Sequence, residues 1–191
     1  MPFKPRIVAL GDSLTSGHGI GSARAFPAVL QRQLDAAGYY YQVVNGGVAG
    51  DTSAGALRRL PALLDLDTRI LIAMLGANDG LRGVPVAQLK ANIGAIIREA
   101  QRRKIAVLLC AMEALPLYGW DYSGAFHRAY GELAAQFAVP LVPFVLVDVM
   151  GRADRLQPDR IHPNEAGAHL IAEHVWPHLQ PLLRRNAPAV M

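Results

Sequence analysis

The sequence predicts an α/β fold, a three-layer α/β/α sandwich built on a flavodoxin-like, five-stranded parallel sheet of order 2-1-3-4-5. Short aliphatic runs alternate with longer helical segments along the 191 residues, a pattern typical of parallel α/β proteins. The runs are apolar at successive positions, as expected for strands covered by helices on both faces. Right-handed crossovers and the small size of the chain favour the order 2-1-3-4-5.

The elements follow from these runs in chain order. The five predicted strands are residues 7–10, 41–44, 70–75, 105–111 and, more weakly, 140–142. The predicted helices are residues 25–37, 53–64, 86–103, 124–137 and 165–183. Asn164 can cap the last helix, and Pro177 should kink or break it. No repeat or linker divides the chain, so we expect one domain over residues 1–191 with a core of about residues 6–183.

Composition excludes several classes of protein. Hydrophobic residues make up 52% and charged residues 18% of the chain, which indicates a globular protein. The net charge of +4 is small, and the basic runs 102–104 and 184–185 fall at predicted helix C-termini, where cations complement the helix dipole. We therefore expect no nucleic-acid partner. The single cysteine, Cys110, lies in an apolar run and is expected to be a buried structural thiol.

Two features of the sequence bear on the cellular compartment of the protein. No apolar stretch is long enough to span a membrane, so no stable membrane insertion is expected. The first strand begins almost at once and leaves no room for a signal peptide. The sequence as written therefore predicts a cytoplasmic protein, or a periplasmic or secreted one if a signal peptide has been removed. The oligomeric state is left open.

Functional residues should lie in the crevice at the carboxyl ends of the strands, where the strand order reverses. Four segments satisfy this condition: residues 11–14 after strand 1, 45–52 after strand 2, 76–79 after strand 3, and 159–164 before the last helix. Each segment is also compatible with a plain turn or a helix cap. Together, however, they contain every group that acyl transfer needs.

The candidates for these roles are few. Ser13 is the candidate nucleophile, His162 its base, and Asp159 the residue that orients the base, because one tight turn can bring residues 159 and 162 together. Gly50 can present an unobstructed backbone N–H, and Asn78 can offer a side-chain N–H. His174 and His178 suggest a metal site, but Pro177 lies between them and the zincin glutamate is absent. Both are expected on the helix surface, and no metal site is predicted.

This constellation resembles the GDSL/SGNH hydrolase family, and more closely its bacterial subgroup of thioesterases, lysophospholipases and arylesterases. Ser13, Gly50, Asn78 and His162 fall on the four positions that give the family its letters, and the likeness spans residues 7–183. The resemblance implies that Ser13 attacks an ester or thioester carbonyl, with Asp159 and His162 completing a triad. It also implies an oxyanion hole formed by the Ser13 N–H, the Gly50 N–H and the Asn78 side chain. No cofactor is implied.

The expected substrate is a small-molecule ester. Residues 115–122 follow strand 4 and are rich in aromatic side chains. The resemblance implies that this segment lines an acyl pocket, with Leu115, Pro116, Tyr118 and Trp120 as substrate-binding candidates; ordinary packing of the aromatic rings is the alternative. The sequence thus predicts a serine esterase for aryl and short-to-medium acyl esters, with thioesters or lysophospholipids as further candidates. Two alternatives stay open: a carbohydrate O-acetyl esterase, and a non-catalytic flavodoxin-like binding module.

Overall fold

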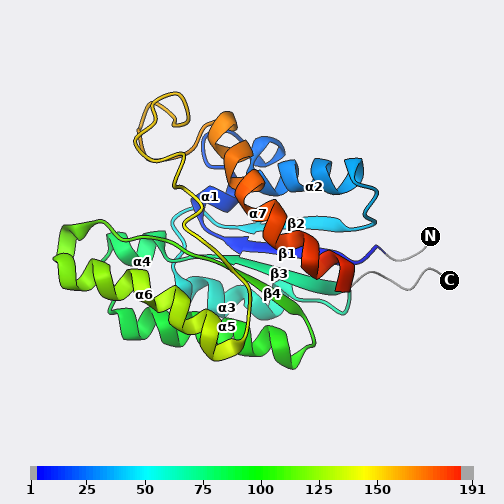
Figure 1. The fold of residues 1–191 in the computed structure, drawn as a ribbon, viewed down its shortest axis with the longest axis horizontal. Coiled ribbons are helices and arrows are strands. Elements are labelled where there is room, and N and C mark those ends of the chain that lie inside the picture. Colours follow the sequence, from blue (N-terminus) through cyan, green and yellow to red (C-terminus); the bar gives the residue numbers. More distant parts are fainter. Residues whose placement is uncertain (1–3, 186–191) are drawn as a thin grey trace.

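The computed structural model describes residues 4–185 and contains a five-stranded parallel sheet of order β2-β1-β3-β4-β5 (Figure 1). This confirms the predicted fold class and strand order. The strands are β1 (Arg6–Gly11), β2 (Gln42–Gly47), β3 (Thr68–Met74), β4 (Ala106–Cys110) and β5 (Leu141–Val142). Because all of them run in parallel, their carboxyl ends meet at one edge of the sheet, and the segments after them lie together.

Helices cover both faces of the sheet. One layer holds α2 (Phe26–Ala36) and α7 (Glu165–Arg185); the other holds α3 (Ser53–Leu63), α5 (Val86–Arg102) and α6 (Trp120–Phe137) (Figure 1). Four short helices were not predicted. They are α1 (Ser13–Ser16), η1 (Ser22–Arg24), α4 (Ala77–Leu81) and η2 (Pro116–Tyr118). Two of these, α1 and α4, follow strands β1 and β3 closely and carry candidate site residues.

The core is built from the strands at the centre of the sheet. Residues 7–10 of β1 and 70–72 of β3 are fully buried, as their two-sided apolar runs predict. Cys110 in β4 is also fully buried, and burial raises the pKa of its thiol, so it is a structural residue. Strand β2 lies at the edge of the sheet, as the predicted order requires, and it is not buried on both faces: Gln42 is exposed and its valines are only half-buried. The edge position explains this partial burial, because an edge strand has a neighbouring strand on one side only.

Helix α6 begins at Trp120, four residues before the predicted start at Gly124. Tyr122, Phe126 and Tyr130 recur every four residues, and their rings contact one another along the helix at centroid distances of 6.0 and 5.8 Å. This apolar stripe favours helix from the first turn onward. The segment 115–122 is therefore largely helical instead of an open loop.

Helix α7 excludes a break at Pro177 and confirms the predicted cap. It continues through Pro177 and is not broken there. Pro177 and Pro181 have no backbone N–H, so the carbonyls of Glu173 and Pro177 lose the hydrogen bonds that these N–H groups would donate. Glu173 and Pro177 both lie on the exposed face of the helix, where water can satisfy their carbonyls. Asn164 caps the first turn as predicted, accepting a hydrogen bond from the Gly167 N–H at 3.1 Å.

His174 and His178 are both partly exposed on α7, where the sequence predicts surface residues, and His174 has partners there. Its ring nitrogens lie 3.0 Å from the Val145 carbonyl and 2.9 Å from Asp148 Oδ2, so the side chain anchors the segment between β5 and α7. The first of these basic runs ends a helix, since α5 stops at Arg102, and Arg184 and Arg185 lie in the last described turn of α7. Among the residues that the structure describes, no helix combines the length and apolar character that crossing a membrane requires.

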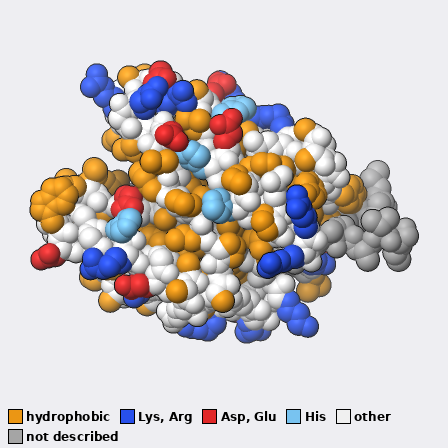
Figure 2. All heavy atoms as spheres, in the orientation of Figure 1, with side chains coloured by type: hydrophobic (Ala, Val, Ile, Leu, Met, Phe, Trp, Pro, Cys, Tyr) orange, Lys and Arg blue, Asp and Glu red, His pale blue; other side chains and the backbone are white. Residues whose placement is uncertain are grey.

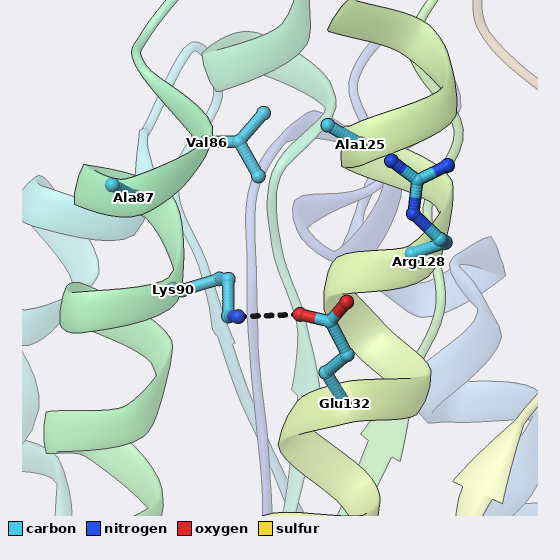
Figure 3. A pocket seen from close by; sticks show the side chains of 6 residues that line it. All are labelled: Val86, Ala87, Lys90, Ala125, Arg128 and Glu132. Carbon is cyan, nitrogen blue, oxygen red and sulfur yellow. Dashed lines mark hydrogen bonds and ion pairs between the residues drawn. The ribbon is translucent and has the colours of Figure 1, made fainter. Parts of the chain in front are cut away.

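Large apolar side chains are exposed at the end of the molecule where α6 begins (Figure 2). The most exposed of them is Trp120, at 81%. A separate hollow of about 450 Å³ lies between α5 and α6, where Lys90 forms an ion pair with Glu132 (Figure 3). None of the candidate catalytic residues lines this hollow.

Candidate active site

Ser13 stands where strand β1 passes into helix α1. The carboxylate of Asp12 caps this helix by accepting a hydrogen bond from the Leu14 N–H at 3.0 Å. As the first helical residue, Ser13 has an N–H with no acceptor inside the helix. Gly11 permits the tight passage, because a Cβ there would lie 1.9 Å from Thr15 Oγ1. The hydroxyl and the N–H of Ser13 are thus both presented at the carboxyl edge of the sheet.

His162 and Asp159 come from the segment between β5 and α7, which folds back over the same edge (Figure 1). His162 Nε2 lies 3.2 Å from Ser13 Oγ, and His162 Nδ1 lies 2.7 Å from Asp159 Oδ2. Asp159 Oδ1 accepts hydrogen bonds from the Ile161 and His162 N–H groups at 2.9 and 3.0 Å. The His162 side chain and these N–H groups hold the pKa of Asp159 well below its usual range, so the carboxylate stays ionised beside the imidazole.

Gly50 lies in a tight turn after strand β2. The Asp51 N–H donates to the Val48 carbonyl at 3.1 Å, which closes the turn and leaves the Gly50 N–H outside this bond. Gly50 has a φ of 76°, a left-handed conformation that favours glycine at this position of a turn. The Gly50 carbonyl accepts a hydrogen bond from Arg82 Nη2 at 2.8 Å.

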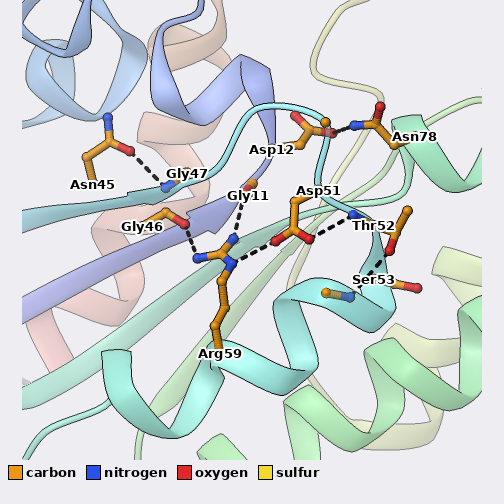
Figure 4. A network of polar contacts seen from close by, with 12 residues as sticks. Gly11, Asp12, Asn45, Gly46, Gly47, Asp51, Thr52, Ser53, Arg59 and Asn78 are labelled. Atoms are coloured by element: carbon orange, nitrogen blue, oxygen red, sulfur yellow. Dashed lines mark hydrogen bonds and ion pairs between the residues drawn. The ribbon is translucent and has the colours of Figure 1, made fainter.

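Asn78 lies in the first turn of helix α4. The sequence alone was also compatible with a plain turn at this position. Its side-chain Nδ2 donates to Asp12 Oδ2 at 3.2 Å (Figure 4). Because an amide NH₂ carries two N–H groups, one remains for a ligand. The structure therefore links Asn78 to the residue that directly precedes Ser13.

The profile of the family described as GDSL-like Lipase/Acylhydrolase matches residues 9–170, a span that contains all these groups. The chain belongs to this family. The resemblance inferred from the sequence is thereby confirmed, and with it the prediction of a serine esterase. The alternative of a non-catalytic flavodoxin-like binding module is set aside.

Curated relatives and solved structures agree with this family assignment. Esterase TesA of Pseudomonas aeruginosa is 43% identical over 93% of this chain and 89% of its own length. Thioesterase 1/protease 1/lysophospholipase L1 of Escherichia coli K12 is 35% identical over 95% of this chain and 86% of its own. A crystal structure of TesA superposes with a TM-score of 0.88 at 42% identity, covering 93% of this chain and 99% of that one.

In this GDSL-family chain, two buried carboxylates, Asp12 and Asp79, accept hydrogen bonds from the segments that carry the candidate site residues. Asp12 is 1% exposed, and burial raises its pKa to about 6, although the Leu14 and Asn78 N–H groups oppose the effect. Asp79, next to Asn78, is fully buried and accepts hydrogen bonds from the Ser53 N–H and hydroxyl at 2.8 and 2.5 Å. These bonds fasten α4 to the start of α3, just beyond the Gly50 turn.

Gln157 joins the nucleophile segment to the segment that holds the imidazole. Its side-chain Nε2 donates to the His18 carbonyl at 2.7 Å and to the Pro163 carbonyl at 2.9 Å. The His18 ring lies beside the His162 ring, with centroids 4.6 Å apart. Two segments more than 130 residues apart in sequence are thus held together by one amide.

Of the four substrate-binding candidates, Tyr118 contacts the end of α4, and the other three are exposed nearby in the chain. Tyr118 donates from its hydroxyl to the Leu81 carbonyl at 3.2 Å, and its ring would be 2.6 Å from a Cβ at Gly83. Leu115 is 55% exposed, Pro116 is exposed, and Trp120 starts α6 at 81% exposure. The segment therefore borders the Asn78 helix, and the apolar side chains around it reach solvent.

Sequence reasoning overlooked several residues of this site. Asp12 was considered only through the possible helix cap in residues 11–14, and Gln157 and Arg59, whose Nη2 donates to the Gly11 carbonyl at 2.8 Å, were not singled out. Nothing in the sequence showed that Asp12 is buried, because an aspartate at the start of a helix suits an exposed cap equally well. Nothing local marked the other two, because glutamine and arginine are common on any surface.

Proposed function

We propose that this enzyme hydrolyses carboxylic esters through an acyl-enzyme formed on Ser13. The observation that carries the proposal is a single imidazole, His162, lying 2.7 Å from Asp159 Oδ2 and 3.2 Å from Ser13 Oγ. With its proton on Nδ1, His162 donates to Asp159 and accepts from the Ser13 hydroxyl. It then takes the Ser13 proton as the hydroxyl oxygen attacks the carbonyl carbon, and Asp159 stabilises the resulting imidazolium.

The remaining steps follow from the same groups. The tetrahedral oxyanion accepts hydrogen bonds from the Ser13 N–H, the Gly50 N–H and the Asn78 side chain. His162 gives its proton to the departing alcohol or phenol as the C–O bond breaks. It next removes a proton from water, which attacks the acyl carbon, and the acid leaves as Ser13 regains its proton.

The proposed substrates are aryl esters and short-to-medium acyl esters, with thioesters and lysophospholipids as an extension. The names of the relatives support this range, since they include an arylesterase, a thioesterase and a lysophospholipase. The apolar residues at 115–120 also favour apolar acyl groups over sugars, which places a carbohydrate O-acetyl esterase second.

Hydrolysis of a p-nitrophenyl ester series, with and without a serine-directed phosphonate, tests the proposal. We expect turnover that the phosphonate abolishes, and a mass increase located on the peptide containing Ser13. Full activity after stoichiometric phosphonate labelling, or labelling at another serine with loss of activity, would contradict the assignment of Ser13. Thioester and lysophospholipid assays on the same preparation then rank the substrate classes.

A further inference from the structure

Arg59 connects the nucleophile strand to the turn that carries Gly50 (Figure 4). Its guanidinium donates from Nη2 to the Gly11 carbonyl at 2.8 Å, from Nη1 to the Gly46 carbonyl at 2.6 Å, and from Nε to Asp51 Oδ2 at 2.7 Å. One planar cation thus contacts the last residue of β1, the end of β2, and the residue directly after Gly50.

These contacts are shielded from solvent. The side chain of Arg59 is 23% exposed and that of Asp51 is 11% exposed. Charge-assisted hydrogen bonds in such surroundings are stronger and better defined than exposed ion pairs. The neighbouring Arg58, in contrast, is exposed, so the two adjacent arginines of α3 differ in their surroundings.

The acceptors of Arg59 lie next to the reacting groups along the chain. Gly11 is two residues before Ser13, and its carbonyl also accepts a hydrogen bond from the Val48 N–H at 3.1 Å. Val48 and Asp51 are the two ends of the turn that contains Gly50. Both ends of that turn are therefore fastened to the residue that leads into the nucleophile, one by the Val48 N–H and the other by Arg59 through Asp51.

We propose that Arg59, together with Asp51, is a positioning residue that sets the Gly50 N–H at its working distance from Ser13. It does not touch the substrate. The inference rests on the proposed function, in which Gly50 donates to the oxyanion. An oxyanion donor acts mainly in the transition state, and a misplacement of about 1 Å can cost about a hundredfold in rate. Removing the hydrogen bonds that Arg59 makes with Gly11, Gly46 and Asp51 should therefore lower kcat much more than it changes KM.

The experiment compares full-length Arg59→Gln, Arg59→Lys and Asp51→Asn with a matched control, Arg58→Gln. Each is assayed on p-nitrophenyl butyrate and on the thionoester in which sulfur replaces the carbonyl oxygen. Sulfur is a larger and weaker hydrogen-bond acceptor than oxygen, so the ratio of kcat/KM for the two esters reports on the oxyanion donors alone. Circular dichroism and thermal unfolding establish that each variant is folded.

We expect Arg59→Gln to lower kcat on the oxygen ester by about tenfold to a hundredfold, with KM within about threefold of wild type. The preference for the oxygen ester should fall in parallel. Arg59→Lys should recover part of both losses, Asp51→Asn should show a smaller loss of the same kind, and Arg58→Gln should match wild type.

Two results would overturn the inference. One is wild-type kcat in folded Arg59→Gln; the other is reduced activity with an unchanged preference between the two esters, which would indicate general loosening of the fold. If Arg59→Gln does not fold, Arg59→Lys and Asp51→Asn carry the same comparison. Failure of the proposed function is distinguishable, because wild-type esterase activity would then survive Ser13→Ala.

Discussion

At the scale of single residues, the site depends on atoms placed within hydrogen-bond distance by segments far apart in the chain. His162 reaches Ser13 across a sequence separation of 149 residues, and Asn78 reaches Asp12 across 66. Each of these contacts joins a side chain with a proposed chemical role to another that fixes its direction. Removing one atom should therefore have large kinetic effects and small structural ones.

Ser13→Ala should fold normally and lose nearly all esterase activity. The missing hydroxyl is the proposed nucleophile, and loss of a triad member costs about a thousandfold to a millionfold in turnover. The measurement is kcat on p-nitrophenyl butyrate, with Ser16→Ala, in the same short helix, as the matched control. Near-normal turnover in Ser13→Ala would remove the residue from the mechanism.

Asn78→Ala should lower kcat by about a hundredfold to a thousandfold, with a smaller change in KM, because an oxyanion donor acts mainly in the transition state. Steady-state kinetics on one aryl ester provide the comparison. A loss confined to KM would show that Asn78 binds the substrate in its ground state instead.

At the scale of elements, the site is assembled from turns and short helices that follow the strands. Helices α1 and α4 present Ser13 and Asn78, and the return segment before α7 supplies Asp159 and His162. The segment from η2 into α6 contributes apolar bulk beside α4 and none of the proposed triad residues. It should therefore influence the choice of acyl group more than the chemical step.

Leu115→Ala and Trp120→Ala test this division of roles. A hydrophobic pocket discriminates by about 1–3 kcal/mol per methylene, so the ratio of kcat/KM on octanoyl and acetyl esters should change by about tenfold or more. Activity on the best substrate should fall far less than in Ser13→Ala. Leu66→Ala, which truncates an exposed leucine just before β3, is the control. If neither variant changes the ratio, these side chains do not form the acyl pocket, and residues 81–86 become the next candidates.

At the scale of the whole molecule, the buried carboxylate of Asp12 links the active site to stability. Burial raises the pKa of Asp12 from 3.8 to about 6 in the folded protein. The protonated form is thus favoured by folding, and this contribution is fully present below about pH 3.8 and is lost as the pH rises through about 6. The enzyme carries an ionised, buried carboxylate at neutral pH at some cost in stability.

The prediction is that wild type gains stability relative to Asp12→Asn as the pH falls from 8 to 5. Linkage gives a gain of about 1 to 1.5 kcal/mol over this interval. Urea unfolding of both proteins at several pH values measures the difference, and titrations that the two proteins share cancel. A difference that is constant with pH would contradict a raised pKa for Asp12.

The sequence by itself determined the sheet, its strand order and the segments that hold the site. Apolar runs such as residues 7–10 and 70–72 have a local signature, because strands buried on both faces require apolar side chains at every position. Topology then places the carboxyl ends of these strands together. Ser13, Gly50, Asn78, Asp159 and His162 could be singled out for that reason.

Only the tertiary structure decided how these groups are held. The unbroken α7 follows from the exposure of the face that carries Pro177. The contacts of Arg59, Gln157 and Asp12 join segments that are distant in the chain. Arginine, glutamine and aspartate suit any solvated surface, so their local sequence does not indicate a buried partner. The hydrogen-bond partners of these side chains are fixed only when the strands and helices pack. The contacts that hold the site together can therefore be seen in the fold but not in the sequence.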